Sequence, residues 1–224
     1  MIAPVACVIP ALDAAATLGD VASGLRAALP RATIVAVDDG SVDATSDVAR
    51  YACDVVVRFP GNRGKGAALR AGISEAMQRG AAAVVTIDGD GQHPPEAAPS
   101  LLAALSHADV AIGARSRSSS AMPIGRRMTN ALASAAVGAI IGSSIADSQS
   151  GFRAIRRSVL ESVVAHGDRY EYETDFLIQA GRAGFRITAV PIATVYGAPS
   201  HFQALRDSAR VVRTIWRHRA GVLR

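Results

Sequence analysis

The chain has 224 residues and half of them are apolar, so it is long enough to form one large domain around a sizeable core. The net charge is +5 at pH 7, and the segment 202–224 supplies all of it, with six arginines and one aspartate. The first 201 residues carry equal numbers of acidic and basic side chains, which excludes a basic body of the kind that binds nucleic acid. Two cysteines without ligand spacing exclude a disulfide scaffold and indicate thiols in a reducing cytosol.

The first half of the chain alternates apolar runs with segments of helical periodicity. The apolar runs predict strands at Val5–Ile9, Thr33–Val37, Val55–Phe59, Ala81–Ile87 and Val110–Gly113. The segments between them predict helices at Thr17–Leu29, from a cap at Ser41 or Asp43 to Ala52, from Gly66 to Gln78 and from Pro94 to His107. Strands that alternate with helices of this length form βαβ units, so the expected fold class is α/β, with a mostly parallel sheet flanked by helices.

The second half is less regular. A loop rich in serine and arginine at 115–122 precedes a predicted helix at Ile124–Ile141, a short strand within Ser150–Arg156, a helix at Tyr172–Gly184 and an extended segment at Arg186–Val195. Met128–Ala146 is the longest uncharged stretch, but its alanine, glycine and serine content predicts a packed helix and not a membrane span. The absence of a repeat or a long linker predicts a single domain.

Polar residues follow each of the five predicted strands. They are Asp13 after the first strand, Asp38 and Asp39 after the second, 62–65 after the third, 88–93 after the fourth and Arg115 after the fifth. The carboxyl ends of parallel strands lie at one edge of the sheet, where ligands bind in such folds. The sequence therefore predicts a single binding site at this edge.

The segment Asp88-Gly89-Asp90-Gly91-Gln92-His93 leaves the fourth strand and enters a glycine-flanked turn. Two carboxylates and an amide at alternate positions are hard oxygen donors that suit Mg²⁺ or Mn²⁺ held together with a phosphate. A plain acidic turn is the alternative, and the clustering of polar strand ends disfavours it. The glycine-rich turn Gly61–Gly66 could likewise cradle a phosphate or cap a helix, and it lacks the spacing of a P-loop or a dinucleotide-binding fingerprint.

Several of these segments form an ordered set of motifs. The first are Val8-Ile9-Pro10-Ala11, Val37-Asp38-Asp39-Gly40-Ser41-x-Asp43, Asn62-x-Gly64-Lys65-Gly66 and Asp88-Gly89-Asp90-x-Gln92-His93-x-Pro95. The later ones are Gly113-x-Arg115, Asp147-Ser148-Gln149-Ser150-Gly151-Phe152-Arg153 and Tyr172-Glu173-Thr174-Asp175. Over residues 4–215 the set resembles family 2 glycosyltransferases of the GT-A fold, and the later motifs are similar to the branch of dolichol- and polyprenol-phosphate mannosyl- and glucosyltransferases. The resemblance implies a GT-A domain at 1–201, and the composition of the segment 202–224 predicts a basic amphipathic C-terminal helix.

The resemblance also implies roles for the acidic motifs. Asp88, Asp90 and Gln92 would hold Mg²⁺ or Mn²⁺ against the diphosphate of a nucleotide-sugar donor. Asp38 and Asp39 would accept hydrogen bonds from the base or ribose of the donor.

Further residues follow from the same resemblance. Arg115, with Arg126 or Arg127, would bind phosphate, and these arginines bracket a loop that could close over the donor. The other implied substrate-binding residues are Pro10, Asp13, Asn62, Gly64, Lys65, Ser150, Arg153, Glu173 and His201, and the implied catalytic residues are Asp90, Arg115 and Asp175. The usual Asn-Glu after the first-strand proline is Asp13-Ala14 here, which leaves guanine and uracil both open as the base.

The acceptor decides whether the reaction needs a general base. A lipid phosphate is already anionic near neutral pH, whereas a sugar hydroxyl must lose a proton. Glu173 and Asp175 are the candidate bases; two positions apart on a helix they cannot share one face, and Asp175 is favoured. His201 lies where the family carries a basic or polar residue near the acceptor.

The expected function is therefore that of a metal-dependent, inverting glycosyltransferase. It would move a hexose from a donor of the GDP-mannose or UDP-glucose type to a polyprenyl or dolichyl phosphate, at the cytoplasmic face of the membrane. Two alternatives stay open: a soluble glycosyltransferase that acts on a hydroxyl acceptor, and a nucleotide-sugar-binding module without catalysis. A nicotinamide-dependent oxidoreductase is disfavoured by the placement of the glycines.

The basic tail has its own periodicity. Leu205, Ala209, Val212 and Trp216 form an apolar stripe at helical spacing, and the arginines at 206, 210, 213 and 217 repeat that spacing one residue later. Such a helix could lie on an anionic membrane surface, or its apolar stripe could pack on the domain while the arginines face water. The sequence favours neither of these two arrangements over the other.

Overall fold

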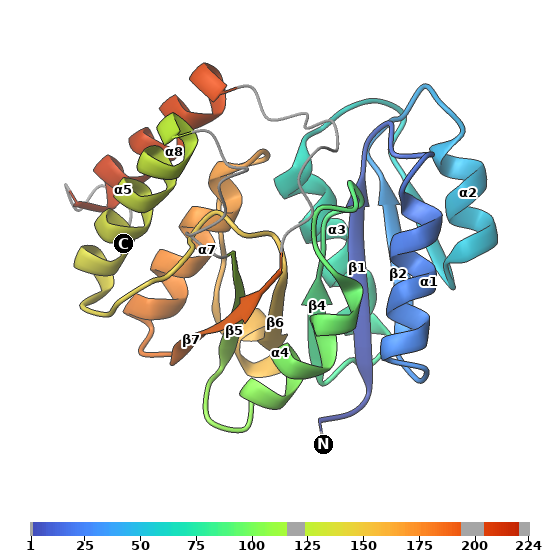
Figure 1. The fold of residues 1–224 in the computed structure, drawn as a ribbon, viewed down its shortest axis with the longest axis horizontal. Helices are drawn as coiled ribbons and strands as arrows, with labels where there is room; N and C mark the ends of the chain where they lie inside the picture. The colour runs from blue at the N-terminus through green and yellow to red at the C-terminus, as the bar shows by residue number, and fades with distance from the viewer. Residues whose placement is uncertain (1, 116–123, 194–203, 220–224) are drawn as a thin grey trace.

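The computed structural model describes residues 2–115, 124–193 and 204–219, except for the side chains of 124–127 and 204–208. A seven-stranded sheet runs through the molecule in the order β3-β2-β1-β4-β6-β5-β7 (Figure 1). Its strands are β1 (Val5–Ala11), β2 (Thr33–Asp38), β3 (Val55–Arg58), β4 (Ala83–Thr86), β5 (Val110–Arg115), β6 (Arg153–Arg156) and β7 (Ile187–Ile192). Only β6, of the described strands, runs antiparallel to its neighbours, so the expected mostly parallel α/β sheet is confirmed.

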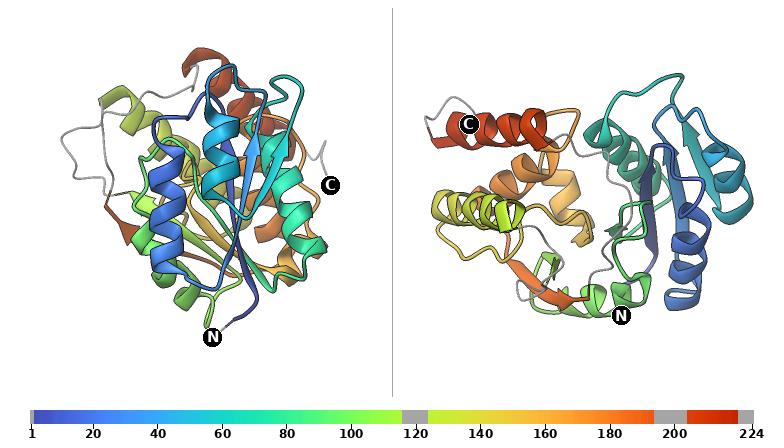
Figure 2. Two further views of the ribbon diagram at one scale, coloured as in Figure 1. Left: turned by 90° about the vertical axis from the view of Figure 1, so that its right-hand side faces the viewer. Right: turned by 45° about the horizontal axis from the view of Figure 1, so that its top comes forward.

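Helices cover both faces of the sheet (Figures 1 and 2). They are α1 (Leu18–Ala28), α2 (Thr45–Ala52), α3 (Lys65–Gln78), α4 (Ala98–Ala104), α5 (Ile124–Ile141), α6 (Arg157–Ser162), α7 (Glu171–Arg182) and α8 (Ala204–Arg219), with a 3₁₀ turn η1 at Pro95–Ala97. The single helix predicted from Pro94 to His107 is thus η1 followed by α4. Pro99 lies in the first turn of α4, where its missing N–H costs nothing.

Two apolar cores result from the alternation of side chains along the strands. In β1, Cys7 and Ile9 point to the core that α1 and α4 cover, whereas Ala6 and Val8 point to the core that α3 and α7 cover. All four side chains are almost fully buried. Burial on both faces explains why the strands read as continuous apolar runs in the sequence. Both faces of the sheet are therefore covered, and the polar residues collect at its carboxyl edge.

Helices α5, α7 and α8 pack together at the opposite end of the molecule from α2 (Figures 1 and 2). The inward face of α8 carries Val211, Thr214 and His218, all of which are buried. The side chains of Val212 and Trp216, one helical face away, are each 64% exposed.

The exposure of Val212 and Trp216 bears on whether the apolar stripe of the tail packs on the domain. Val212 and Trp216, with Ala209, belong to the apolar stripe that the sequence could place either on the domain or on a membrane, and none of the three packs on the domain. The side chain of Leu205 lies outside the described residues. So does the predicted boundary between 201 and 202, which stays a prediction.

Candidate active site

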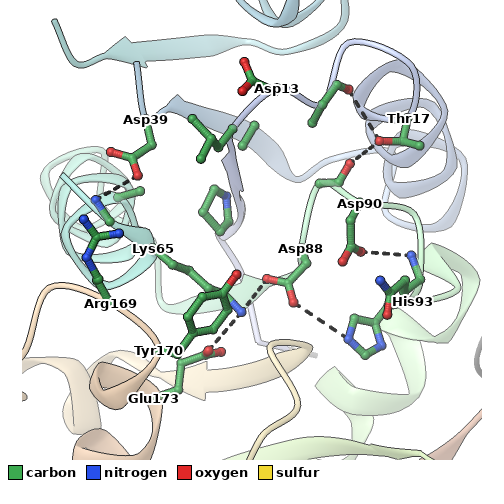
Figure 3. A pocket seen from close by; sticks show the side chains of 18 of the residues that line it. Asp13, Thr17, Asp39, Lys65, Asp88, Asp90, His93, Arg169, Tyr170 and Glu173 are labelled. Atoms are coloured by element: carbon green, nitrogen blue, oxygen red, sulfur yellow. Dashed lines mark hydrogen bonds and ion pairs between the residues drawn. The ribbon is translucent and has the colours of Figure 1, made fainter. Parts of the chain in front are cut away.

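A pocket of about 240 Å³ opens where β1, β2 and β4 end (Figure 3). The predicted site residues that line it are Pro10, Asp13, Asp39, Asn62, Gly64, Lys65, Asp88, Asp90, Gln92, Arg115 and Glu173. They come from the ends of β1 to β5, the start of α3 and the first turn of α7. The polar segments that follow the strands in the sequence therefore meet in one cavity.

Lys65 lies at the centre of this cavity and joins two carboxylates. Its ammonium nitrogen is 2.7 Å from Oδ1 of Asp88 and 2.9 Å from Oε2 of Glu173. Burial alone would lower the pKa of Lys65, but the two carboxylates hold it above its usual value. Burial alone would raise the pKa of Asp88, but the charge of Lys65 holds it below its usual value. Lys65 and Asp88 therefore stabilise each other's charged form in this part of the pocket.

The pKa values of Asp90 and His93 are both shifted in the direction that favours the uncharged side chain. Burial and the neighbouring charge of Asp88 raise the pKa of Asp90 to about 6. Burial lowers the pKa of His93 to about 4, so its imidazole is neutral at pH 7. The Nε2 atom of His93 lies 4.0 Å from Oδ2 of Asp88, while its buried Nδ1 atom has no hydrogen-bond partner within the described protein.

Asp38 and Asp39 are adjacent in sequence but only Asp39 lines the pocket. Asp39 accepts the backbone N–H groups of Arg63 and Gly64 at 2.7 and 2.8 Å, which fixes the turn before α3. Burial raises its pKa despite these two bonds.

Asp38 turns into the protein instead. Its carboxylate accepts the Ser41 backbone N–H at 2.8 Å and the Ser46 hydroxyl, and it lies 3.5 Å from Nε of Arg58. Burial opposes ionisation, but the hydrogen bonds of the two serines lower the pKa of Asp38 below its usual value. The predicted contact of Asp38 with the donor is therefore not seen in the pocket lining. Neighbouring residues at a strand end point to opposite sides, so only one of the two can face the cavity.

Arg115 reaches the pocket from the end of β5. Its guanidinium makes a two-pronged ion pair with Asp147, with Nε to Oδ2 at 2.7 Å and Nη2 to Oδ1 at 3.1 Å. A carboxylate that holds a guanidinium in this way fixes its plane and direction. The side chains of Arg126 and Arg127 and all of His201 lie outside the described residues, so their predicted roles stay predictions.

Asp175, favoured by the sequence as a base, does not line the pocket. Its carboxylate is buried and contacts His218 of α8, with Oδ1 to Nε2 at 2.5 Å, and it accepts the His166 backbone N–H at 2.7 Å. Glu173 lines the cavity in its place. One face of α7 turns toward the pocket and another toward α8, and the sequence could not tell which residue belongs to which.

Ser150 and Arg153 are likewise buried away from the pocket lining. The guanidinium of Arg153 donates to the backbone carbonyls of Ser148, Ser150 and Glu173 at 2.9 to 3.0 Å. Arg153 therefore holds the first turn of α7 in place, and it acts on the site through the backbone of Glu173.

Two pocket residues, Arg169 and Tyr170, were not found from the sequence. They precede α7, and this segment packs directly on the start of α3. Gly66 permits the contact, since a Cβ there would lie 2.6 Å from Cβ of Tyr172. The Tyr170 ring lies 5.4 Å from the Lys65 ammonium. No strand or strand end marks these residues, and the glycines at the start of α3 are the one signal that could have suggested a close approach.

The sequence also missed Asn130 and Gln149, which line the cavity from α5 and from the loop before β6.

The donor set Asp88, Asp90 and Gln92 fits a divalent cation only in part. Within the described residues no group of three His, Cys, Asp or Glu side chains could hold a metal ion by itself. Two carboxylates and an amide oxygen are nevertheless hard ligands of the kind that bind Mg²⁺ or Mn²⁺ together with phosphate oxygens. Burial and the charge of Asp88 raise the pKa of Asp90, and an added cation would offset both effects. Gly151 also leaves room beside Asp88, since a Cβ there would lie 2.5 Å from Oδ2. The residues fit a cation that is shared with a phosphorylated ligand.

Comparison with known proteins gives the family of the chain. The model of the glycosyl transferase family 2 matches residues 6–164, which is more than half of the chain. The chain belongs to glycosyl transferase family 2. The undecaprenyl-phosphate mannosyltransferase of Micrococcus luteus is 34% identical over 182 residues, which are 76% of this chain and 75% of that protein. The polyprenol monophosphomannose synthase of Mycolicibacterium smegmatis is 31% identical over 198 residues, 83% of this chain and 75% of that protein.

A solved structure shows the same fold. It is the glucosyl-3-phosphoglycerate synthase of Mycobacterium tuberculosis in complex with Mn²⁺, uridine diphosphate and glucosyl-3-phosphoglycerate. It has a TM-score of 0.76 and 22% sequence identity, and the match covers 96% of this chain and 79% of that one. The GT-A fold that the motifs implied is therefore confirmed.

Proposed function

We propose that this family 2 glycosyltransferase is metal-dependent and transfers a hexose, with inversion, from a nucleotide-sugar to a polyprenyl or dolichyl phosphate. The observation that carries the proposal is the meeting of Asp39, Lys65, Asp88 and Asp90 in one pocket. Two relatives of at least 31% identity are named for sugar transfer to such lipid phosphates or for their mannosylated products, which supports the acceptor class. The donor would be of the GDP-mannose or UDP-glucose type.

Different pocket residues would bind different parts of the donor. Asp39 would accept a hydrogen bond from the base or ribose, at the end of the pocket where Arg169 also lies (Figure 3). Asp88, Asp90 and Gln92 would hold a divalent cation, which when bound neutralises charge on the departing nucleoside diphosphate. Arg115, with its plane set by Asp147, would bind a phosphate oxygen by directed hydrogen bonds. The new bond forms between the sugar C1 and an acceptor oxygen, and the bond from C1 to the diphosphate breaks.

The state of the two candidate bases favours a phosphate acceptor over a hydroxyl. Asp175 is buried against His218, and Glu173 is paired with the Lys65 ammonium. Neither carboxylate is placed to take a proton from an incoming hydroxyl without first losing its partner. A lipid phosphate needs no such base, because it is already an anion. The same pair of observations weighs against the alternative of a soluble enzyme with a hydroxyl acceptor.

The exposed face of α8 supports a peripheral contact with the cytoplasmic face of a membrane. Val212 and Trp216 are exposed next to Arg213 and Arg217, so apolar and cationic groups lie side by side on one helix. An amphipathic helix of this composition binds anionic lipid surfaces, with its aromatic ring at the interface. None of the described helices has the length and apolar character that a membrane crossing requires.

A donor panel tests the proposed function. Nucleoside diphosphate release is measured with GDP-mannose and with UDP-glucose, with and without Mn²⁺, in the presence of a short polyprenyl phosphate. The proposal expects release that needs both Mn²⁺ and the lipid phosphate. Release that instead requires a sugar hydroxyl acceptor would favour the soluble enzyme, and donor binding without any turnover would favour a binding module.

A further inference from the structure

Asp175 lies at a junction between two parts of the molecule that are distant in sequence. Its Oδ1 atom lies 2.5 Å from Nε2 of His218 on α8, and both side chains are buried. Arg182 donates to Nδ1 of His218 at 3.1 Å and to the His218 backbone carbonyl at 2.6 Å. An Nδ1 atom that accepts from a guanidinium carries no hydrogen, so the imidazole proton is on Nε2 and is donated to Asp175. Helix α8 is therefore held on α7 by a connected polar network.

The second oxygen of the Asp175 carboxylate bonds to a segment that lines the pocket. Oδ2 of Asp175 accepts the backbone N–H of His166 at 2.7 Å. His166 starts the short segment 166–170 that carries Arg169 and Tyr170 into the pocket lining. The Ala67 N–H, in the first turn of α3, bonds the carbonyl of Asp168 in this segment at 3.1 Å. A displacement of His166 would therefore reach the pocket directly.

We propose that Asp175 is a positioning residue that couples α8 to the pocket segment 166–170. Its carboxylate accepts from α8 with one oxygen and from the segment with the other, so order in α8 supports the placement of Arg169 and Tyr170. Coupling of this kind is reciprocal: nucleotide binding that orders the segment also stabilises α8. The inference goes beyond the proposed reaction, and it uses that proposal only in taking nucleoside diphosphates as probes.

The test changes the α8 side of the junction and measures the pocket side. His218→Leu removes the donor to Asp175, while His218→Gln keeps an N–H that can replace it. Hydrogen–deuterium exchange of the whole chain is followed in peptides that cover 166–170 and 209–219. We expect His218→Leu to speed exchange about tenfold or more in both regions, as loss of a buried hydrogen bond implies, and His218→Gln to restore much of the protection.

A matched control separates coupling from simple loosening of the helix. Val211→Ala leaves a cavity under the same face of α8 without touching the junction, because Val211 is buried there and makes no bond to Asp175. It should speed exchange in 209–219 and leave 166–170 unchanged. Equal effects of Val211→Ala and His218→Leu on 166–170, or no effect of His218→Leu there, would overturn the proposal. Asp175→Asn serves as the second variant if His218→Leu fails to fold, with the same expected result.

Nucleotide binding gives the functional measure. The dissociation constants of GDP and UDP are measured with Mn²⁺, and His218→Leu should raise that of whichever nucleotide binds by about fivefold or more, the usual range for coupled sites. With a turnover assay, the KM for the donor should rise while kcat changes little. A binding constant equal to that of the wild type would contradict the coupling. Failure of the wild type to bind either nucleotide would count against the proposed function, and the exchange measurement would still decide the role of Asp175.

Discussion

The carboxyl edge of the sheet and the α5–α7–α8 end both bury carboxylates, but they use them differently. At the α8 end, Asp175 gives both oxygens to groups of the protein, one to His218 and one to His166. At the sheet edge, Asp88 and Glu173 share the single ammonium of Lys65, and Asp90 is repelled by Asp88. Asp175 at the first end joins parts of the fold, whereas we propose that Asp88 and Asp90 at the second hold a ligand. Burial alone does not distinguish the two uses; the identity of the partners does.

The same division separates two neighbours in sequence. Asp38 is satisfied by Ser41 and Ser46 inside the protein, whereas Asp39 lines the pocket. This pair compares a carboxylate that turns into the protein with one that lines the pocket while also holding the turn before α3.

The largest effect is expected from Asp90→Ala. The change removes a predicted ligand of the divalent cation while leaving the fold, because it also removes the repulsion between Asp90 and Asp88. Turnover should fall about a thousandfold, the scale of losing electrostatic stabilisation of a leaving group, with the melting temperature unchanged or higher. Asp47→Ala, at an exposed position of α2, is the control and should leave turnover intact. Retained activity in Asp90→Ala would contradict the proposed role of Asp90 as a metal ligand.

Lys65→Met should have the next largest effect, this time on stability. It leaves the carboxylates of Asp88 and Glu173 buried without their shared ammonium. Removing one partner of a buried ion pair costs about 3 kcal/mol in the free energy of unfolding, measured by urea denaturation. Adding Glu173→Gln to this variant should recover part of the loss. A double variant no more stable than the single one would show that the cluster is not the cause.

Asp38→Asn and Asp39→Asn should differ in their effect on nucleotide affinity. Asp38→Asn should lower stability by about 2 kcal/mol and leave nucleotide affinity nearly unchanged. Asp39→Asn should also lower stability, because its amide N–H would face a backbone N–H of Arg63 or Gly64, but it should in addition lower nucleotide affinity about tenfold. The stability cost of Asp38→Asn depends on pH. The pKa of Asp38 is lowered in the folded state, so its contribution is present above about pH 4, its unfolded value, and is lost as the pH falls through the folded value. A cost that persists undiminished in acid would contradict this account of Asp38.

The smallest effect is expected from Trp216→Ser. Loss of an exposed ring from α8 should weaken partition into anionic phosphatidylglycerol vesicles about tenfold, on the scale of burying one large apolar side chain, and hardly change stability. Tyr51→Ser is a matched control, because Tyr51 is exposed on α2 at the other end of the molecule. Equal binding of Trp216→Ser and the wild type to anionic vesicles would contradict the proposed membrane contact of α8. Equal binding of the wild type to neutral and to anionic vesicles would also contradict it.

The sequence predicted the sheet edge well because strand ends carry a local signal. Asp13, Asp39, Lys65 and Asp88 each follow an apolar run, and parallel strands bring such ends together. It could not resolve Asp38 from Asp39, because the direction of a side chain at a strand end depends on the register of pairing with β1.

Other parts of the site depend on tertiary packing that no local pattern records. The rotation of α7 about its axis, which points Glu173 to the pocket and Asp175 to α8, is set by what α7 packs against. Arg169 and Tyr170 reach the pocket only because the segment before α7 rests on the start of α3. The antiparallel placement of β6 between β4 and β5 is likewise a long-range pairing.

The most direct test of the account is to look for the product. The wild-type chain is incubated with a short polyprenyl phosphate and each of GDP-mannose and UDP-glucose in the presence of Mn²⁺, and the lipid is examined by mass spectrometry. We expect a lipid heavier by one hexose with one of the donors, absent with EDTA and absent with Asp90→Ala. An unmodified lipid alongside sugar transfer to a hydroxyl acceptor, or a product that forms equally well in EDTA, would contradict it.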